Sequence, residues 1–299
     1  AIIMKRRDFI KTASAVGVSG VIGRAGHAAV KYTKDNRPDN SGPGFDVHPF
    51  IRNNPDAVFI WKTNVPSKKD TAQIESAGYD LARELIVKVP SGGYPFSTRV
   101  TVKPNWTSAG PKDGKPVFEK LGVNTDPNFV KGWVRGMREM GPQDYFIRES
   151  CCPRQWEPLG YRSMCDENNI DLRDLSSMDF WDLKKDDINF IKVHDGVVFK
   201  EVGFMSPMNR PDTCLINIAK MKSHGMGITA SIKNLQGTTG NRFHSFCTPA
   251  DQVLKRMKRK YHKFFHKKFV KHVEELYAKH VEMGIPRWDR SEPANRNGL

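Results

Sequence analysis

The chain has 299 residues, of which 38% are hydrophobic and 10% are aromatic, a composition too apolar for a disordered protein. A mean hydropathy of −0.57 and the lack of a long apolar run exclude a polytopic membrane protein. The formal net charge is +15, of which residues 1–28 carry +4, residues 255–272 carry +9 and the rest of the chain +2. The basic character therefore belongs to local segments and not to the whole fold.

The first 28 residues have the features of an export signal. A basic start is followed by a mildly apolar stretch, residues 12–23, which is too short and too rich in Gly, Ser and Ala to span a bilayer. The start, Arg6-Arg7-Asp8-Phe9-Ile10-Lys11, resembles a twin-arginine translocation signal. We expect cleavage after Ala28 and export of the folded protein to the periplasm or another extracytoplasmic compartment. A Sec signal or a basic amphipathic helix is the alternative.

Residues 1–3 are interpreted as translated upstream sequence, with Met4 as the start. Residues 29–55 are rich in Pro, Gly, Asn and Asp and predict an extended lead-in. Export in the folded state favours a cofactor that binds before export, but it does not identify one.

Residues 56–248 alternate between strand and helix patterns, which predicts an α/β domain with a layered mixed β-sheet flanked by helices. Residues 213–218 form a nearly all-apolar strand, as expected of a central strand covered on both faces. The other expected elements are strands at 57–61, 99–102 and 145–149, helices at 70–86 and from Asp126-Pro127 to Gly141-Pro142, and a hairpin over 188–202. Gly78 weakens the first helix pattern.

Residues 249–285 predict one long basic amphipathic helix, with apolar positions three or four apart and a cationic opposite face. We expect residues 255–272 to contact an acidic protein or an anionic membrane surface; a solvated face that only aids solubility is the alternative. Residues 286–299 form a polar tail without a closing element, which leaves open whether the reading frame continues past Leu299.

The segment after the apolar strand combines cationic residues with glycine. Lys222, His224, Gly225 and Gly227 form an expected loop, and Thr229 can cap a following helix that carries Lys233 and Asn234. Such a loop presents backbone N–H groups, a helix N-terminus and ammonium groups to one point, which suits an anionic ligand. A solvated turn with surface lysines is the alternative.

These residues resemble the uncharacterised domain of unknown function family 362. The matching motifs are Lys222-x-His224-Gly225, Ile228-Thr229, Lys233-Asn234-Leu235-x-Gly237, Lys103-Pro104-Asn105, Thr125-Asp126-Pro127, Glu149 and Asp171-Leu172. Members often occur beside ferredoxin-type iron–sulphur modules and sometimes behind twin-arginine signals, so the resemblance implies a possible redox setting. A remote similarity to the amino-terminal domain of lactate racemase implies an enzyme-like body. The paired-histidine Asp-His-x-x-x-His motif of that enzyme is absent, which argues against nickel-cofactor racemisation.

Candidate roles follow from positions at or just past strand ends. His224 and Lys222 are candidate catalytic residues together with Glu149, which either completes an acid/base pair with one of them or neutralises a lysine. For His224, a structural or capping role is the alternative. The expected ligand-binding residues are Lys103, Asn105, Gly225, Gly227, Thr229, Lys233 and Asn234.

The five cysteines are an odd number without Cys-x-x-Cys spacing, so neither a zinc ribbon nor a ferredoxin cluster is expected, and no metal ligand is assigned. Pairing of Cys151 or Cys152 with Cys165 is one option in an oxidising compartment, and Cys214 fits a buried thiol.

The sequence thus predicts an exported α/β protein that binds an anionic substrate or cofactor of unknown identity in a Lys/His/Gly cleft. Whether it is an enzyme stays open. The alternative is a non-enzymatic accessory protein that docks through its basic helix. Nucleic acid is not expected, because export separates the protein from it.

Overall fold

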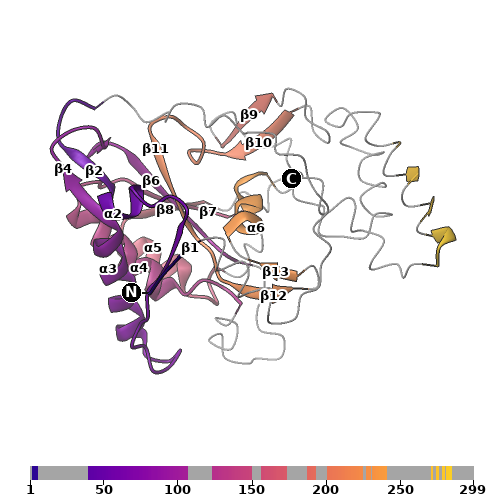
Figure 1. The fold of residues 1–299 in the computed structure, drawn as a ribbon, viewed down its shortest axis with the longest axis horizontal. Helices are drawn as coiled ribbons and strands as arrows, with labels where there is room; N and C mark the ends of the chain where they lie inside the picture. The colour runs from indigo at the N-terminus through magenta and orange to yellow at the C-terminus, as the bar shows by residue number, and fades with distance from the viewer. Residues whose placement is uncertain are drawn as a thin grey trace. The chain divides into compact units, whose positions relative to one another are not determined.

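The computed structural model describes residues 2–5, 40–106, 123–149, 156–173, 187–192, 201–224, 227–229 and 231–240, with scattered positions over 271–284 (Figure 1). The chain divides into two compact units. The first comprises Ala1–Thr98 and Asn128–Gln143, and the second comprises Arg99–Pro127 and Asp144–Leu299.

The first unit contains a small antiparallel sheet of order β4-β2-β5. Its strands are β2 (Gly44–Val47), β4 (Ile86–Val89) and β5 (Tyr94–Pro95), and Phe45 of the central strand stacks on Tyr94 with ring centroids 5.5 Å apart. A separate antiparallel pair joins β1 (Ile2–Lys5) to β3 (Ala57–Ile60), and a short helix, α2, spans Pro49–Arg52.

Two longer helices of the first unit pack closely, α3 (Thr71–Leu85) and α4 (Pro127–Glu139). The Asp70 carboxylate accepts a hydrogen bond from the Gln73 N–H at 3.1 Å and so caps α3. Gly78 of α3 and Gly132 of α4 lie against the backbone of the opposite helix, where a Cβ atom would collide with a carbonyl oxygen. Glycine here permits the close approach, so Gly78 supports the packing although it weakens the helix pattern.

The second unit is built on a parallel four-stranded sheet of order β11-β6-β7-β8 (Figure 1). The strands are β6 (Arg99–Pro104), β7 (Tyr145–Arg148), β8 (Ile170–Arg173) and β11 (Thr213–Ile218), with α5 (Tyr161–Glu167) between β7 and β8. Val100, Val102 and Ile147 on the two middle strands are fully buried. The predicted hairpin corresponds to β9 (Ile188–Lys192) paired antiparallel with β10 (Glu201–Met205).

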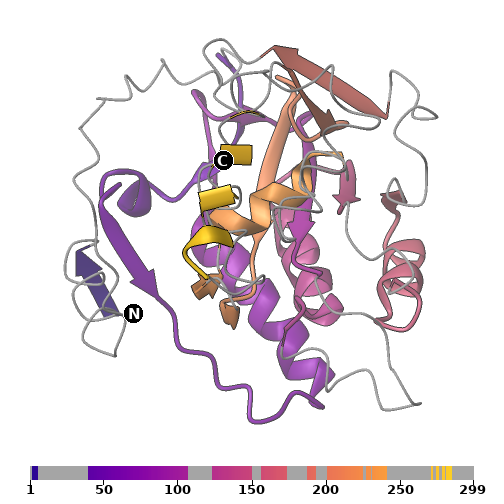
Figure 2. The same cartoon turned by 90° about the vertical axis from the view of Figure 1, so that its right-hand side faces the viewer.

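After β11 the chain forms a small ribbon and a short helical segment. Strand β12 (Lys222–His224) pairs antiparallel with β13 (Gly227–Thr229), and α6 (Ser231–Leu235) continues into the 3₁₀ turn η4 (Gln236–Thr238). Helix α6 packs against β6 and β11 (Figures 1 and 2).

The mixed α/β architecture agrees with the prediction, and several local features differ. The predicted lead-in over 29–55 contains β2 and α2, and the predicted Lys/His/Gly loop contains the paired strands β12 and β13. Within the described sheet, β11 is an end strand that pairs with β6, and its side chains are half-buried, so the expectation of a central strand was wrong. An apolar run marks a strand of a covered parallel sheet without fixing its order in that sheet.

The long basic helix predicted over 249–285 lies mostly outside the described residues, although positions 271, 274–275, 278–279 and 281–282 are helical. Among the helices described here, none is both long enough and apolar enough to cross a membrane.

Candidate functional site

The strand order of the parallel sheet identifies one edge position as a candidate site. The chain proceeds from β6 to β7 to β8 in one direction, whereas β11, the last of the four, pairs on the other side of β6. Connections therefore diverge at the boundary between β6 and β11, which makes it a topological switch point. In open α/β sheets, ligands bind outside the carboxyl ends of the strands at such a point.

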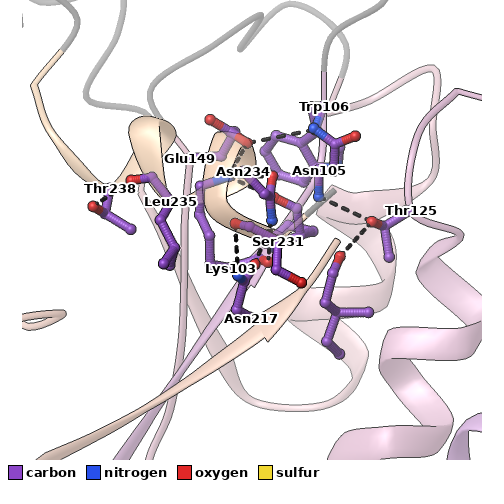
Figure 3. A network of polar contacts seen from close by, with 12 residues as sticks. Lys103, Asn105, Trp106, Thr125, Glu149, Asn217, Ser231, Asn234, Leu235 and Thr238 are labelled. Atoms are coloured by element: carbon purple, nitrogen blue, oxygen red, sulfur yellow. Dashed lines mark hydrogen bonds and ion pairs between the residues drawn. The ribbon is translucent and has the colours of Figure 1, made fainter. Parts of the chain in front are cut away.

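A buried ion pair lies at this edge. Lys103 near the end of β6 pairs with Glu149, the residue directly after β7 (Figure 3). The two side chains are 0% and 3% exposed. The Lys103 ammonium also donates to the Asn234 Oδ1 at 3.1 Å and to the Pro104 carbonyl oxygen at 2.6 Å, while Glu149 Oε2 accepts from the Trp106 N–H at 3.4 Å. These polar contacts offset part of the desolvation cost of burying two charges.

Asn234 of α6 connects the two strands that meet at the switch point. Its amide nitrogen donates to the Lys103 carbonyl oxygen at 3.1 Å and to the Asn217 Oδ1 at 2.7 Å (Figure 3). The Asn217 amide in turn donates to the Ser231 carbonyl oxygen at 3.0 Å. The side chains of Asn234 and Asn217 therefore fix α6 over the carboxyl ends of β6 and β11.

The turn after α6 lies directly on the ion pair. A Cβ atom on Gly237 would come within 2.7 Å of Lys103 Cε and 2.9 Å of Lys103 Nζ, and it would also collide with Glu149 Oε1. Glycine at this position lets η4 lie this close to the two side chains without displacing them. Thr238 closes the turn by donating its hydroxyl to the Leu235 carbonyl oxygen at 2.7 Å.

A second polar cluster extends the same edge of the sheet. Asn105 and Thr125 form two hydrogen bonds with each other. The Asn105 N–H donates to the Thr125 Oγ1 at 2.9 Å, and the Thr125 N–H donates to the Asn105 carbonyl oxygen at 2.9 Å. The Thr125 hydroxyl donates to the Ile218 carbonyl oxygen at 2.7 Å, which links the end of β11. The Lys222 ammonium donates to the Asn105 Oδ1 and to the Val123 carbonyl oxygen at 2.7 Å. The positively charged ammonium group of this partly exposed lysine therefore lies beside the switch point.

Three buried aromatic residues support this cluster. Trp106 lies 5.0 Å from Trp156 and 4.3 Å from Tyr161, measured between ring centroids. The Tyr161 hydroxyl donates to the Thr125 carbonyl oxygen at 2.9 Å, and burial raises the pKa of Tyr161 well above its usual value. The phenol is therefore a neutral donor that helps fix Thr125.

Arg148 at the end of β7 binds internal partners. Its guanidinium donates to the Asp171 carboxylate at 3.1 Å and to the Ser206 carbonyl oxygen at 2.9 Å. Burial lowers the pKa of Arg148, opposed by hydrogen bonding and charge attraction to Asp171. This pair links β7, β8 and the residue that follows β10.

The structure brings five of the predicted site residues into two contact groups, with Lys103, Glu149 and Asn234 in one and Asn105 and Lys222 in the other. Glu149 pairs with Lys103, so of the two roles expected for Glu149 the structure shows the one in which it neutralises a lysine. Gly227 and Thr229 lie in β13, and Lys233 lies in α6. Gly225 and the side chains of His224 and Lys233 lie outside the described residues.

Sequence reasoning missed four contributors to the network as site residues, namely Trp106, Thr125, Asn217 and Gly237. Asn217 carried a usable signal, because it is a polar residue near the carboxyl end of an otherwise apolar strand. Thr125 and Gly237 lie in motifs that carry the family resemblance, but their contacts depend on the tertiary structure. Across the described ranges, no three His, Cys, Asp or Glu side chains gather as a metal ion would require.

Comparison with known proteins gives one family match. Searches of curated proteins and of solved structures found no significant match. The model of the family described as "Domain of unknown function (DUF362)" matches residues 100–286, more than half of the chain, including both polar clusters. The chain therefore belongs to the DUF362 family.

Proposed function

We propose that this protein binds a small anionic substrate or cofactor at the carboxyl ends of β6 and β11. The observation that carries the proposal is the strand order β11-β6-β7-β8, which places the switch point where two polar clusters lie. Open α/β sheets bind ligands at this position because the connecting segments diverge there.

The charge distribution supports an anionic ligand. Lys103 is paired with Glu149, so this buried pair carries no net charge. Lys222 is partly exposed, and its ammonium group donates to the Asn105 amide oxygen and to the Val123 carbonyl oxygen. A lysine held in this way presents a positive charge at a fixed position, which favours a carboxylate or phosphate group.

A binding experiment tests the proposal. Titration of the full chain with pyrophosphate and with citrate, followed by calorimetry, should detect saturable binding of at least one probe. Lys222→Met should weaken that binding about 10- to 100-fold, the range expected for one charge-assisted hydrogen bond. Lys192→Met, which removes an exposed lysine from the end of β9 in the same unit, should leave it unchanged. Equal affinity in the wild type and in Lys222→Met would exclude this site.

A cofactor acquired before export is part of the same proposal. The protein purified from the extracytoplasmic fraction should then contain a stoichiometric small molecule, detectable by absorbance, metal analysis and mass spectrometry of the denatured supernatant. A chain that co-purifies without any small molecule would favour the docking function instead. The redox setting implied by the family resemblance predicts an absorbing cofactor.

A further inference from the structure

The segment Ser231–Thr238, which comprises α6 and η4 and is called the strap below, covers the Lys103–Glu149 pair (Figure 3). We propose that the strap opens locally, without unfolding of the sheet, and so exposes the Lys103–Glu149 pair beside the proposed ligand site. The identity of the site as a ligand site rests on the proposed function, whereas the opening of the strap does not.

The strap depends on a few directional contacts. A five-residue helix is too short to be stable by itself, so α6 must be held by its surroundings. Asn234 contacts Lys103 through both its amide oxygen and its amide nitrogen, and it also bonds Asn217. Leu235, by contrast, leaves 37% of its side chain exposed. Among the described side chains of the strap, Asn234 makes most of the hydrogen bonds to the sheet, and Asn217 adds one to the Ser231 carbonyl oxygen. A short segment held by such polar contacts can detach at a lower free energy than the whole unit.

The sheet beneath the strap does not need the strap for its own hydrogen bonds. The parallel register of β11 with β6 runs from Thr213↔Arg99 to Ile218↔Pro104, within the two strands. Detachment of Ser231–Thr238 would therefore break side-chain contacts and leave the strand pairing intact.

The buried pair also favours an opening movement. Both charged groups have lost most of their contact with water, a cost that their mutual attraction and the polar neighbours only partly offset. Opening of the strap rehydrates both groups, so the closed state is stabilised less than a similar apolar contact would be. Gly237 lies against both members of the pair, so η4 must move before any ligand atom reaches Lys103 from that side.

Site-resolved acetylation of Lys103 measures the opening. The full chain is exposed to short pulses of an acetylating reagent at increasing, sub-denaturing urea, and each lysine is quantified by peptide mass spectrometry. Alkylation of Cys165, a fully buried thiol on α5, reports unfolding of the second unit in the same samples. We expect Lys103 to react at low urea at a rate that barely depends on urea, while Cys165 stays protected.

Two variants and a matched control locate the movement. Asn234→Ala removes the main polar contacts of the strap and should raise the rate of Lys103 acetylation about 10- to 1,000-fold, since three hydrogen bonds of modest net value are lost. Gly237→Ala should also raise the acetylation rate, because the added methyl group forces either η4 or the buried pair to shift. Asn168→Ala removes an asparagine that caps α5 by donating to the Met164 carbonyl oxygen, and it should not change Lys103 acetylation at low urea.

The proposal is overturned if Lys103 and Cys165 react with the same urea dependence in the wild type and in Asn234→Ala, because Lys103 would then be exposed only by unfolding. Addition of pyrophosphate separates this result from the proposed function. Local opening without any effect of pyrophosphate or citrate on Lys103 would support the strap and count against the anion site. Binding of pyrophosphate or citrate without local opening would support the anion site and overturn the strap.

Discussion

At the residue scale, the Lys103–Glu149 pair is a buried contact whose loss has a calculable cost. Its two members come from neighbouring parallel strands, and both are almost completely buried. Removal of one partner from a buried pair leaves an uncompensated charge, whereas removal of both leaves only altered packing.

Lys103→Met should therefore lower the free energy of unfolding by about 3–5 kcal/mol, the usual cost of breaking a buried ion pair. The double variant Lys103→Met/Glu149→Gln should recover most of this loss, because glutamine keeps an acceptor for the Trp106 N–H without a negative charge. Urea unfolding of the two single variants, the double variant and the wild type gives the coupling energy. Additive losses would show that the pair does not act as a unit.

Two thiols provide a test of burial. Burial raises the pKa of Cys165 and that of Cys214 to about 12 in each case. Both are free thiols, so the structure does not show the optional pairing of Cys165 with Cys151 or Cys152.

At pH 8 we expect Cys165 and Cys214 to resist iodoacetamide in the native protein and to react in urea, because only about one thiol in 10⁴ is ionised four pH units below its pKa. Since folding raises these pKa values, the associated stability is complete below about pH 9, the ordinary thiol pKa, and is lost as the pH rises towards 12. Peptide mass spectrometry checks the first expectation and urea unfolding at pH 8 and 10 checks the second. Rapid alkylation of either thiol in the native protein would contradict the expected resistance to iodoacetamide.

At the element scale, the contact between α3 and α4 shows that the sequence can predict an element without predicting its packing. The pattern over 70–86 predicts α3, and the structure has Thr71–Leu85. Gly78 weakened that pattern. The contact that requires a glycine there is with the backbone of α4, more than 50 residues away along the chain, and the local sequence cannot reveal it.

Gly132→Ala isolates this packing effect. Alanine favours a helix over glycine by about 1 kcal/mol, yet here its Cβ would collide with the Glu75 carbonyl oxygen and lie 2.9 Å from the Tyr79 nitrogen. We expect a net loss of stability of about 1–3 kcal/mol, the range for overpacked cores. Ser76→Ala on the exposed face of α3 should change stability by less than about 0.5 kcal/mol. Circular dichroism melts compare the two, and a stabilised Gly132→Ala would contradict the close approach.

The candidate site was also predictable only in part, because the sequence indicates elements but not which of them are neighbours. Polar residues at strand ends, such as Lys103, Asn105 and Glu149, can be recognised because parallel strands share a carboxyl edge. The partner of each side chain depends on which strands are neighbours. The sequence indicated strands near β6, β7 and β11, but it did not predict β8 or the end position of β11. For this reason the sequence left open whether Glu149 forms an acid/base pair with Lys222 or His224 or neutralises a lysine, and it did not identify Lys103 as that lysine.

At the scale of the whole molecule, export remains a prediction. If Arg6 and Arg7 form a twin-arginine signal, replacement of both by Lys should leave folded precursor inside the cell, since the pathway reads guanidinium groups that an ammonium group does not mimic. Fractionation of cells followed by immunoblotting measures the distribution. Normal extracytoplasmic levels of the Lys-Lys variant would refute the signal.

The basic segment over 255–272 gives a second prediction at this scale. Its +9 charge should produce co-sedimentation with anionic liposomes at low salt and release at high salt. Replacement of Lys258, Lys260, Lys263 and Lys267 by Gln should abolish the binding. Retention by neutral liposomes, or by the substituted protein, would exclude an electrostatic contact.

The sequence distance across the site has a consequence for biosynthesis. Lys103 and Asn234 are separated by 131 positions in the chain. At about 5–20 residues per second, a ribosome needs roughly 7–26 seconds to pass from one to the other. During that interval the nascent β6 has neither its β11 neighbour nor the covering segment, so Lys103 is not yet enclosed. If the proposed site needs the complete arrangement, its ligand can bind only after synthesis has passed Asn234.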